Sequence, residues 1–151
     1  MPIELFAGLR DTSVARLVEL REAIDESYIA LSEQEAKERF ELLFDRTTNF
    51  LNDNDTDRQR RFVRHWLALR LGEGRSPESV MHALVATGDI LVQVVRLELP
   101  PGAEALELVH ALQHSTYVTA RSVVVVLADD LNRKSNQPDE RIGNHEGGES
   151  Q

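Results

Sequence analysis

Cysteine is absent from this chain of 151 residues. Its absence excludes disulfide bonds, thiolate zinc sites, iron–sulfur clusters and cysteine nucleophiles together. The sequence also lacks the glycine-rich phosphate loop, the GxSxG turn of hydrolases and the HExxH helix of metalloproteases. Because no pattern gives positive evidence for catalysis, we predict that the protein is not an enzyme and has no catalytic residues.

Basic charge and long apolar runs are scarce as well. The chain has 17 Lys and Arg against 26 Asp and Glu, a formal net charge of -9. This charge repels nucleic-acid phosphates and anionic lipids, so we expect neither nucleic acid nor a membrane as a partner. No run approaches the roughly 20 apolar residues of a membrane span, and charges interrupt the first residues, where a secretory signal is apolar. We therefore expect a cytoplasmic protein.

The remaining composition, 41% hydrophobic and 28% charged, is that of one ordinary domain with a packed core. Apolar residues recur every three or four positions and no segment alternates with period two, which predicts an all-α bundle of five or six helices. We assign this bundle to residues 1–133. Residues 134–151 carry almost no apolar side chains and are predicted to form a disordered polar tail.

Turn and capping residues divide the bundle into five predicted helices. They run from about Asp11 to Leu31, from Ser32 to the turn at residues 52–55, from about Asp57 to Gly72, from Ser76 to the break at residues 100–102, and from about Ala103 to Asn132. Capping boxes are predicted at Ser32 with Glu35 and at Thr56 with Gln59. Ser76 followed by Pro77 is typical of a helix start.

The last predicted helix is long for a domain of this size, at roughly 45 Å. It is therefore either broken near residues 114–116 or protrudes and lies against a second subunit. Its late segment, residues 123–127, is apolar on every side, which indicates a central helix or a dimer surface. A strand at this segment is a minority alternative that rests on β-branched residues alone.

Histidines raise the question of a metal or haem site. Glu107, His110 and His114 share one helix face, but helical carboxylate metal proteins need this ExxH element twice, and the chain has it once. We predict no metal site. His82 or His110 could be nominated as a haem ligand, although a histidine in a helical fold is more often structural. We predict no cofactor.

Gly88 lies inside the fourth predicted helix, where glycine costs about 1 kcal/mol relative to alanine. Another element is therefore expected to pack closely there, either Trp66 or the last helix. The alternative is room for a small ligand. That hypothesis places a pocket between the third, fourth and fifth helices, with Trp66, His82 and His110 as candidate ligand-binding residues.

The third predicted helix is rich in arginine, with Arg58, Arg60, Arg61, Arg64 and Arg70. Such a face can contact phosphate or an acidic partner. We favour a solvated face that is paired with nearby acidic residues, because the chain lacks the basic surround of a DNA-reading motif.

Three segments carry a family resemblance: residues 61–70 (RFVRHWLALR), Gly74 and residues 79–84 (SVMHAL). Together they resemble the N-terminal sensory domains of RsbR-type stressosome co-antagonists, over about residues 40–133. The resemblance implies a globin-like helical fold that usually binds no haem, a role in stress signalling and a homodimer. It implies a dimer surface on the first and last helices, for which the candidate residues are Val14, Leu17, Ile24, Val123, Val124 and Leu127. Such domains normally precede a phosphorylatable output domain, whereas this chain continues into a polar tail.

These observations together predict a non-catalytic bacterial signalling module. We expect it to act through contacts with another signalling protein, as a sensor or scaffold that forms a homodimer. The alternative function is a small-molecule or haem sensor that uses the pocket described above.

Overall fold

The computed structural model describes residues 2–136 of the chain. All regular secondary structure in this range is helical, which confirms the predicted all-α bundle with a long C-terminal helix. The elements are α1 (Ile3–Ala7), α2 (Arg10–Glu19), α3 (Arg21–Ile24), the 3-10 helix η1 (Glu26–Ala30), α4 (Glu33–Asp53), α5 (Thr56–Gly72), α6 (Pro77–Glu98) and α7 (Ala103–Ser135).

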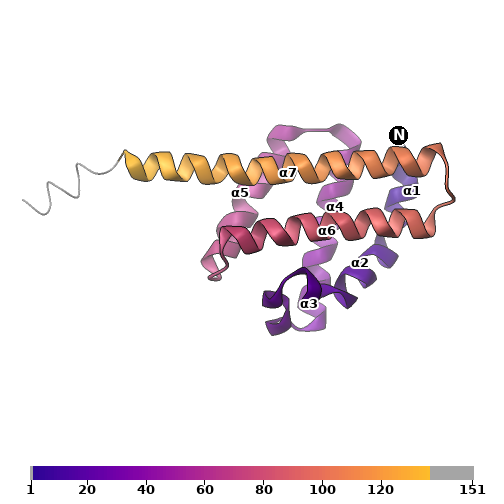
Figure 1. Cartoon of the computed structure of the whole chain (residues 1–151), viewed down its shortest axis with the longest axis horizontal. Helices are drawn as coiled ribbons and strands as arrows, with labels where there is room; N and C mark the ends of the chain where they lie inside the picture. Colours follow the sequence, from indigo (N-terminus) through magenta and orange to yellow (C-terminus); the bar gives the residue numbers. More distant parts are fainter. Residues whose placement is uncertain (1, 137–151) are drawn as a thin grey trace, which may run out of the picture.

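Helix α7 spans the length of the molecule, and α6 lies beside it in the opposite direction (Figure 1). Helix α5 packs against α7 as well, while α4 contacts both α2 and α7. At its C-terminal end α7 extends past the other helices (Figure 1). The predicted break near residues 114–116 is therefore wrong, because the helix is continuous, and its protrusion is confirmed.

The first predicted helix is divided into three pieces, and one short helix before it was missed. Helical geometry lapses at Leu20, and Asp25 is fully extended, with φ -166° and ψ 138°. The Asp25 carboxylate accepts a hydrogen bond from the Ser27 N–H at 3.3 Å, so this side chain stops one helix and caps the next. The missed helix, α1, is anchored by the buried Phe6.

Two of the predicted helix starts are confirmed. The Ser32 hydroxyl accepts from the Glu35 N–H at 3.1 Å, and the Ser76 hydroxyl accepts from the Ser79 N–H at 3.1 Å with Pro77 at the first helical position.

The third predicted helix start is wrong by one residue. The capping residue of α5 is Asp55, whose carboxylate accepts from the Arg58 N–H at 3.0 Å. Thr56 is already helical, and the Gln59 amide donates to the Thr119 hydroxyl of α7 at 3.0 Å. Because an aspartate carboxylate is as good a cap as a threonine hydroxyl, the two adjacent candidates could not be separated by pattern.

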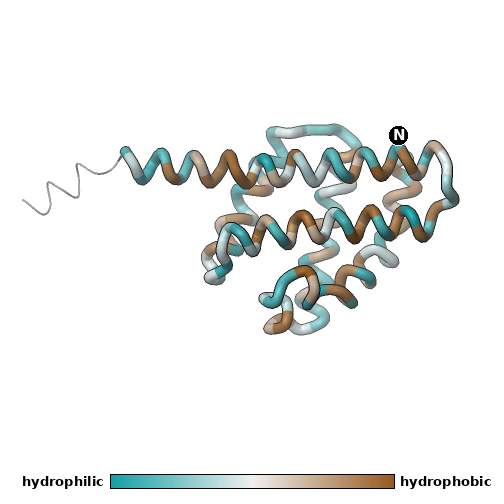
Figure 2. Tube along the Cα trace, viewed as in Figure 1, coloured by the Kyte–Doolittle hydropathy of each residue, from teal (hydrophilic) through white to brown (hydrophobic). Residues whose placement is uncertain are grey.

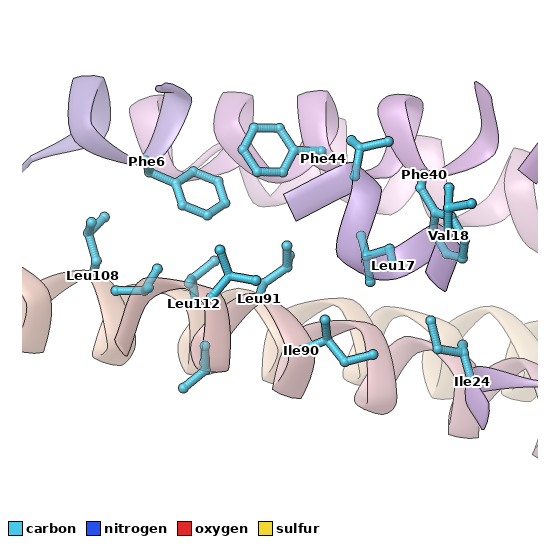
Figure 3. Close-up of a cluster of buried hydrophobic side chains, with 14 of the residues drawn as sticks. Phe6, Leu17, Val18, Ile24, Phe40, Phe44, Ile90, Leu91, Leu108 and Leu112 are labelled. Atoms are coloured by element: carbon cyan, nitrogen blue, oxygen red, sulfur yellow. The ribbon is translucent and has the colours of Figure 1, made fainter. Parts of the chain in front are cut away.

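The core has two parts. The larger part lies between α6 and α7 on one side and α1, α2 and α4 on the other, and Figure 3 shows its side chains meeting from both layers. Phe6 stacks on Phe44 with ring centroids 4.5 Å apart. The smaller part joins α5 to the start of α6 and the late half of α7, through the side chains of Val63, Trp66, Leu67, Val80, Val123 and Val126.

Helix α6 packs against α7, α2, α3 and α5. By length and composition alone it is apolar enough to cross a membrane, which differs from the expectation that no segment approaches that length. Half of its most apolar window is buried inside the bundle. The core helix of a soluble protein meets the same criterion, because other helices cover it on more than one side.

Four predicted dimer-surface residues are inside the single chain. Val14, Leu17, Ile24 and Val123 are between 0% and 3% exposed and pack in its core, so they offer no surface to a second copy. An apolar stripe on a helix has the same pattern whether it faces its own core or a partner. These four residues are therefore removed from the predicted surface, and Val124 and Leu127 remain.

Two further predictions concern the end of α7. The segment 123–127 is helical, so the strand alternative is wrong, and the helix continues to Ser135, two residues beyond the predicted boundary at 133. The predicted tail, residues 134–151, lies outside the described residues from 137 onward.

Candidate functional site

Exposed apolar side chains line the outward face of α7. Leu106, Tyr117, Val124 and Leu131 are 56%, 60%, 57% and 65% exposed. They are separated by 11, 7 and 7 residues, and at about 100° per residue this spacing keeps all four within roughly 40° of one another around the helix. They therefore form one line along the helix.

The line belongs to a regular seam with alternating steps of four and three residues. We call it the α7 stripe, and it consists of Leu106, His110, Gln113, Tyr117, Ala120, Val124, Leu127 and Leu131. This alternation is the spacing by which two helices pack against each other in a coiled coil. The stripe is apolar from Tyr117 to Leu131 and includes polar positions only at His110 and Gln113.

The C-terminal part of the α7 stripe lies on a segment of helix that packs little against the rest of its own chain. Val126 is the last buried residue of α7, and the Arg64 guanidinium reaches Asp129 at 3.5 Å from the flank of α5. Beyond that contact the helix continues to Ser135 with its side chains mostly exposed, and hydrophilic colour predominates along this end in Figure 2. This part gains little from tertiary packing, which normally supplies most of the stability of a helix in a protein.

A small cavity with a mainly apolar wall lies where α4, α5, α6 and α7 meet. Its open volume is about 40 Å³, and its polar lining consists of Arg46, Thr47, Gln59, Thr87, Ser115, Thr116 and Thr119. This volume suits about one water molecule, whereas pockets for metabolites are usually about 300–1,000 Å³. The cavity therefore has no room for haem or a fatty acid.

Gly88 borders this cavity at the crossing of α6 and α7. A Cβ atom at this position would overlap the Thr116 hydroxyl oxygen and lie 3.1 Å from its Cγ2 and 3.2 Å from its Cβ. The predicted tight crossing is confirmed, and its partner is the last helix rather than Trp66. The close approach fixes how α7 sits on α6, and thus which face of α7 points outward.

The candidate ligand-binding residues do not converge. Trp66 is buried in the smaller core cluster, while His82 and His110 are exposed, and none of the three lines the cavity at Gly88. His114 stacks on Phe50 with ring centroids 6.2 Å apart. Within residues 2–136, no three histidine, aspartate or glutamate side chains are grouped so as to hold a metal ion.

An open groove between α2 and α4 has a volume of about 770 Å³. Val14 and Val18 form part of its wall. Arg10 donates to Asp45 at 2.8 Å and to Glu41 at 2.9 Å, and these bonds raise its pKa. The wall holds both cations and anions, so its charge favours no one class of ligand.

A buried ion pair, which sequence reasoning missed, ties the turn before α6 to η1. Arg75 lies 3.0 Å from the Asp25 carboxylate, and the Ser79 hydroxyl donates to Asp25 at 2.8 Å. Burial by itself raises the pKa of Asp25, but hydrogen bonds from Ser27 and Ser79 and the charge of Arg75 outweigh it and lower the pKa. Arg75 also lies over the Tyr28 ring, 5.7 Å from its centroid. The cluster holds the corner of the bundle together, and the Nε and Nη1 atoms of Arg75 are buried in it without a hydrogen-bond partner.

Three of the five predicted arginines of α5 pair with acidic residues of the same chain. Arg58 pairs with Asp53, and Arg70 with Glu73 at 2.5 Å, in addition to the pair between Arg64 and α7. The first two pairs join residues within five positions of each other in sequence, and the third is long-range. The arrangement supports the interpretation of a paired, partly solvated face.

The comparisons with known proteins add no identity: no family model, no curated protein and no solved structure matches this chain.

Proposed function

We propose that the protein is a non-catalytic bacterial signalling module that pairs with a second copy of itself through the α7 stripe. The observation that carries this proposal is the line of exposed apolar side chains from Leu106 to Leu131. Contiguous apolar surface on a soluble chain typically marks a contact with another molecule. The seam spacing of the line suits another helix as that molecule.

The strength of the pairing follows from how much of each side chain becomes buried. A fully exposed large apolar side chain gains about 1.5–3 kcal/mol on full burial, and side chains that are already partly covered gain about half of that. Four such side chains from each copy supply on the order of 10 kcal/mol, against an association cost of about 4–15 kcal/mol. We therefore expect a reversible, concentration-dependent homodimer.

Pairing through α7 leaves the other helices free for a further partner. The resemblance of residues 61–84 to RsbR-type sensory domains supports another cytoplasmic signalling protein in that place, with this chain as sensor or scaffold in a stress response. The acidic net charge of -9 fits a protein partner better than nucleic acid.

The test is the mass of the protein in solution. Val124→Asp with Leu131→Asp places two carboxylates in the stripe, at positions exposed enough for the fold to survive. We expect light scattering and native mass spectrometry to show a dimer for the unmodified chain at rising concentration and a monomer for this variant. Ile29→Asp is the matched control, since Ile29 is 62% exposed but lies on η1, away from the stripe, and should leave the dimer intact.

Circular dichroism of each variant separates loss of pairing from loss of fold. A monomeric unmodified chain at every accessible concentration would refute the proposal. The same refutation follows if the variant with two aspartates is folded and still dimeric.

The alternative function is a small-molecule sensor. Among the sites predicted for it, only the cavity beside Gly88 remains. The small volume counts against it. The same native spectra test it, because a retained ligand would add its mass to that of the chain.

A further inference from the structure

We propose that the two copies lie antiparallel along α7, in the register that places Leu131 of one copy opposite Leu106 of the other. This inference rests on the proposed function, since it specifies the geometry of the same surface. Three features of α7 carry it: the helix dipole, the symmetry of the seam and the protruding end.

The helix dipole of α7 gives its two ends opposite partial charges, positive at the N-terminus and negative at the C-terminus. Glu104 lies in the first turn and Arg133 in the last, but neither side chain lies on the stripe, and Arg133 is paired with Asp130 of its own helix at 2.6 Å. Two parallel helices bring like dipole ends together, whereas an antiparallel pair brings unlike ends together. The helix dipoles therefore favour the antiparallel orientation.

The seam itself selects the register. In an antiparallel pair, two residues face each other when the sum of their numbers is constant, and a sum of 237 sends every position of the α7 stripe onto another position of the stripe. Leu131 then faces Leu106, Val124 faces Gln113, Tyr117 faces Ala120, and Leu127 faces His110. The large Tyr117 meets the small Ala120, as interdigitating seams require.

Registers shifted by seven in this sum bring six rather than eight positions of the stripe opposite the stripe of the other copy. A shift that lowers the sum by seven pairs Val124 with Leu106 and leaves Leu131 facing the loop before α7. A shift that raises it by seven leaves Leu106 without a helical position opposite it in the described chain. Either shift leaves one of the two terminal leucines of the stripe exposed to water in each copy.

The protruding end supplies a further argument. In the antiparallel register, residues 127–135 of each copy lie along the first half of the other copy's α7, which is packed on its own bundle. The contact then runs along the whole helix, about 50 Å by about 10 Å on each copy, or about 1,000 Å² in total. This is the area at which specific interfaces begin, in agreement with a reversible dimer. A parallel pair would leave both protruding ends supported only by each other.

Engineered cysteines test the orientation without interference, because the chain has none of its own. Leu106→Cys and Leu131→Cys are made in separate proteins, mixed and oxidised under mild conditions. A disulfide needs Cα atoms within about 7 Å. We expect the mixture to form a covalent heterodimer, and each protein alone to form no covalent dimer.

A matched control uses Glu104→Cys mixed with Arg133→Cys. These positions also sum to 237 and are both exposed, but they lie on the opposite side of the helix from the stripe. This mixture should give no covalent heterodimer above the background of random collisions.

A distance measurement gives an independent answer. A spin label on the Leu131→Cys protein should lie about 38 Å from its counterpart in the antiparallel dimer, since the positions are 25 residues apart at 1.5 Å each. A parallel pair would bring the two labels to about 10 Å, the spacing of packed helices.

Each outcome separates the two proposals. Cross-linking of the Leu131→Cys protein with itself and a short label distance would overturn the antiparallel orientation while leaving the dimer in place. A dimer with neither cross-link would overturn the register. A monomeric unmodified chain would overturn the dimer and, with it, the inference.

Discussion

The substitution Gly88→Ala tests whether the α6–α7 crossing is as close as the structure shows. In a solvent-exposed helix this change stabilises by about 1 kcal/mol, because alanine has the higher helix propensity. At Gly88 the new methyl group would lie 3.2 Å from the Cβ of Thr116 and overlap its hydroxyl. Rotation of the Thr116 side chain moves the hydroxyl and the methyl group but not Cβ, so the two helices must separate by a few tenths of an ångström.

The magnitude follows from these opposing effects. Overpacking of a close contact costs about 1–3 kcal/mol, and the gain in helix propensity offsets about 1 kcal/mol of it. We expect the free energy of unfolding, measured by urea denaturation followed by circular dichroism, to fall by about 1–2 kcal/mol. Gly72→Ala is the matched control: Gly72 ends α5 with no atom within 4 Å of an added Cβ, so this variant should be unchanged or slightly more stable.

A double-mutant cycle assigns the effect to the named contact. In a Thr116→Ala background the overlapping hydroxyl and the Cγ2 methyl group are gone while the Cβ contact at 3.2 Å remains, so Gly88→Ala should lose less stability than in the unmodified chain, with a coupling of about 1 kcal/mol. If Gly88→Ala alone is as stable as the unmodified chain, the argument for a tight crossing is refuted.

Three further predictions concern the polar contacts of the bundle. Because the pKa of Asp25 is lowered in the folded chain, its ionised form stabilises the fold above the ordinary value of 3.8 and that contribution is lost as the pH falls through the folded pKa. Asp25→Asn should therefore lose stability at neutral pH, and its deficit in urea denaturation should shrink below about pH 4; a constant deficit would contradict this. Asp55→Ala should cost about 1 kcal/mol and Thr56→Ala clearly less, whereas equal costs would contradict the assigned cap of α5. Gln59→Leu should cost about 1–3 kcal/mol by leaving the Thr119 hydroxyl without its donor from α5, and unchanged thermal unfolding would contradict that role.

The sequence specified the fold class and most helix ends because these depend on local chemistry. Ser32 and Ser76 cap their helices as predicted. Each serine hydroxyl accepts from the backbone N–H three residues later, which is the usual spacing of a helix N-cap. The division of the first helix was missed because apolar spacing continues across Asp25. The carboxylate that breaks it there is held by Ser79 and Arg75, which lie 50 or more positions later in the chain. A cause at that distance leaves no local pattern.

The candidate site shows the same limit of prediction from local sequence patterns. Val14 and Val124 both fall on apolar helix faces, yet the first is buried by its own chain and the second is exposed. The difference depends on which helices pack together, and helical periodicity alone does not contain that information. Sequence reasoning named Val124 and Leu127 but not Leu106, Tyr117 and Leu131, although the seam that joins them was present in the spacing; Leu127 is also partly buried against the smaller core cluster.

The length of α7 is where sequence and structure together say most about function. A helix of 33 residues exceeds what this bundle can cover, so part of it must face water, break or meet another molecule. Glycine and proline, which would break it, are absent from residues 103–135, and the seam keeps one face apolar to Leu131. A chain that needed only a closed bundle would gain nothing by continuing that pattern past Val126, its last buried residue. The continuation is explained if residues 127–135 are covered by a second copy.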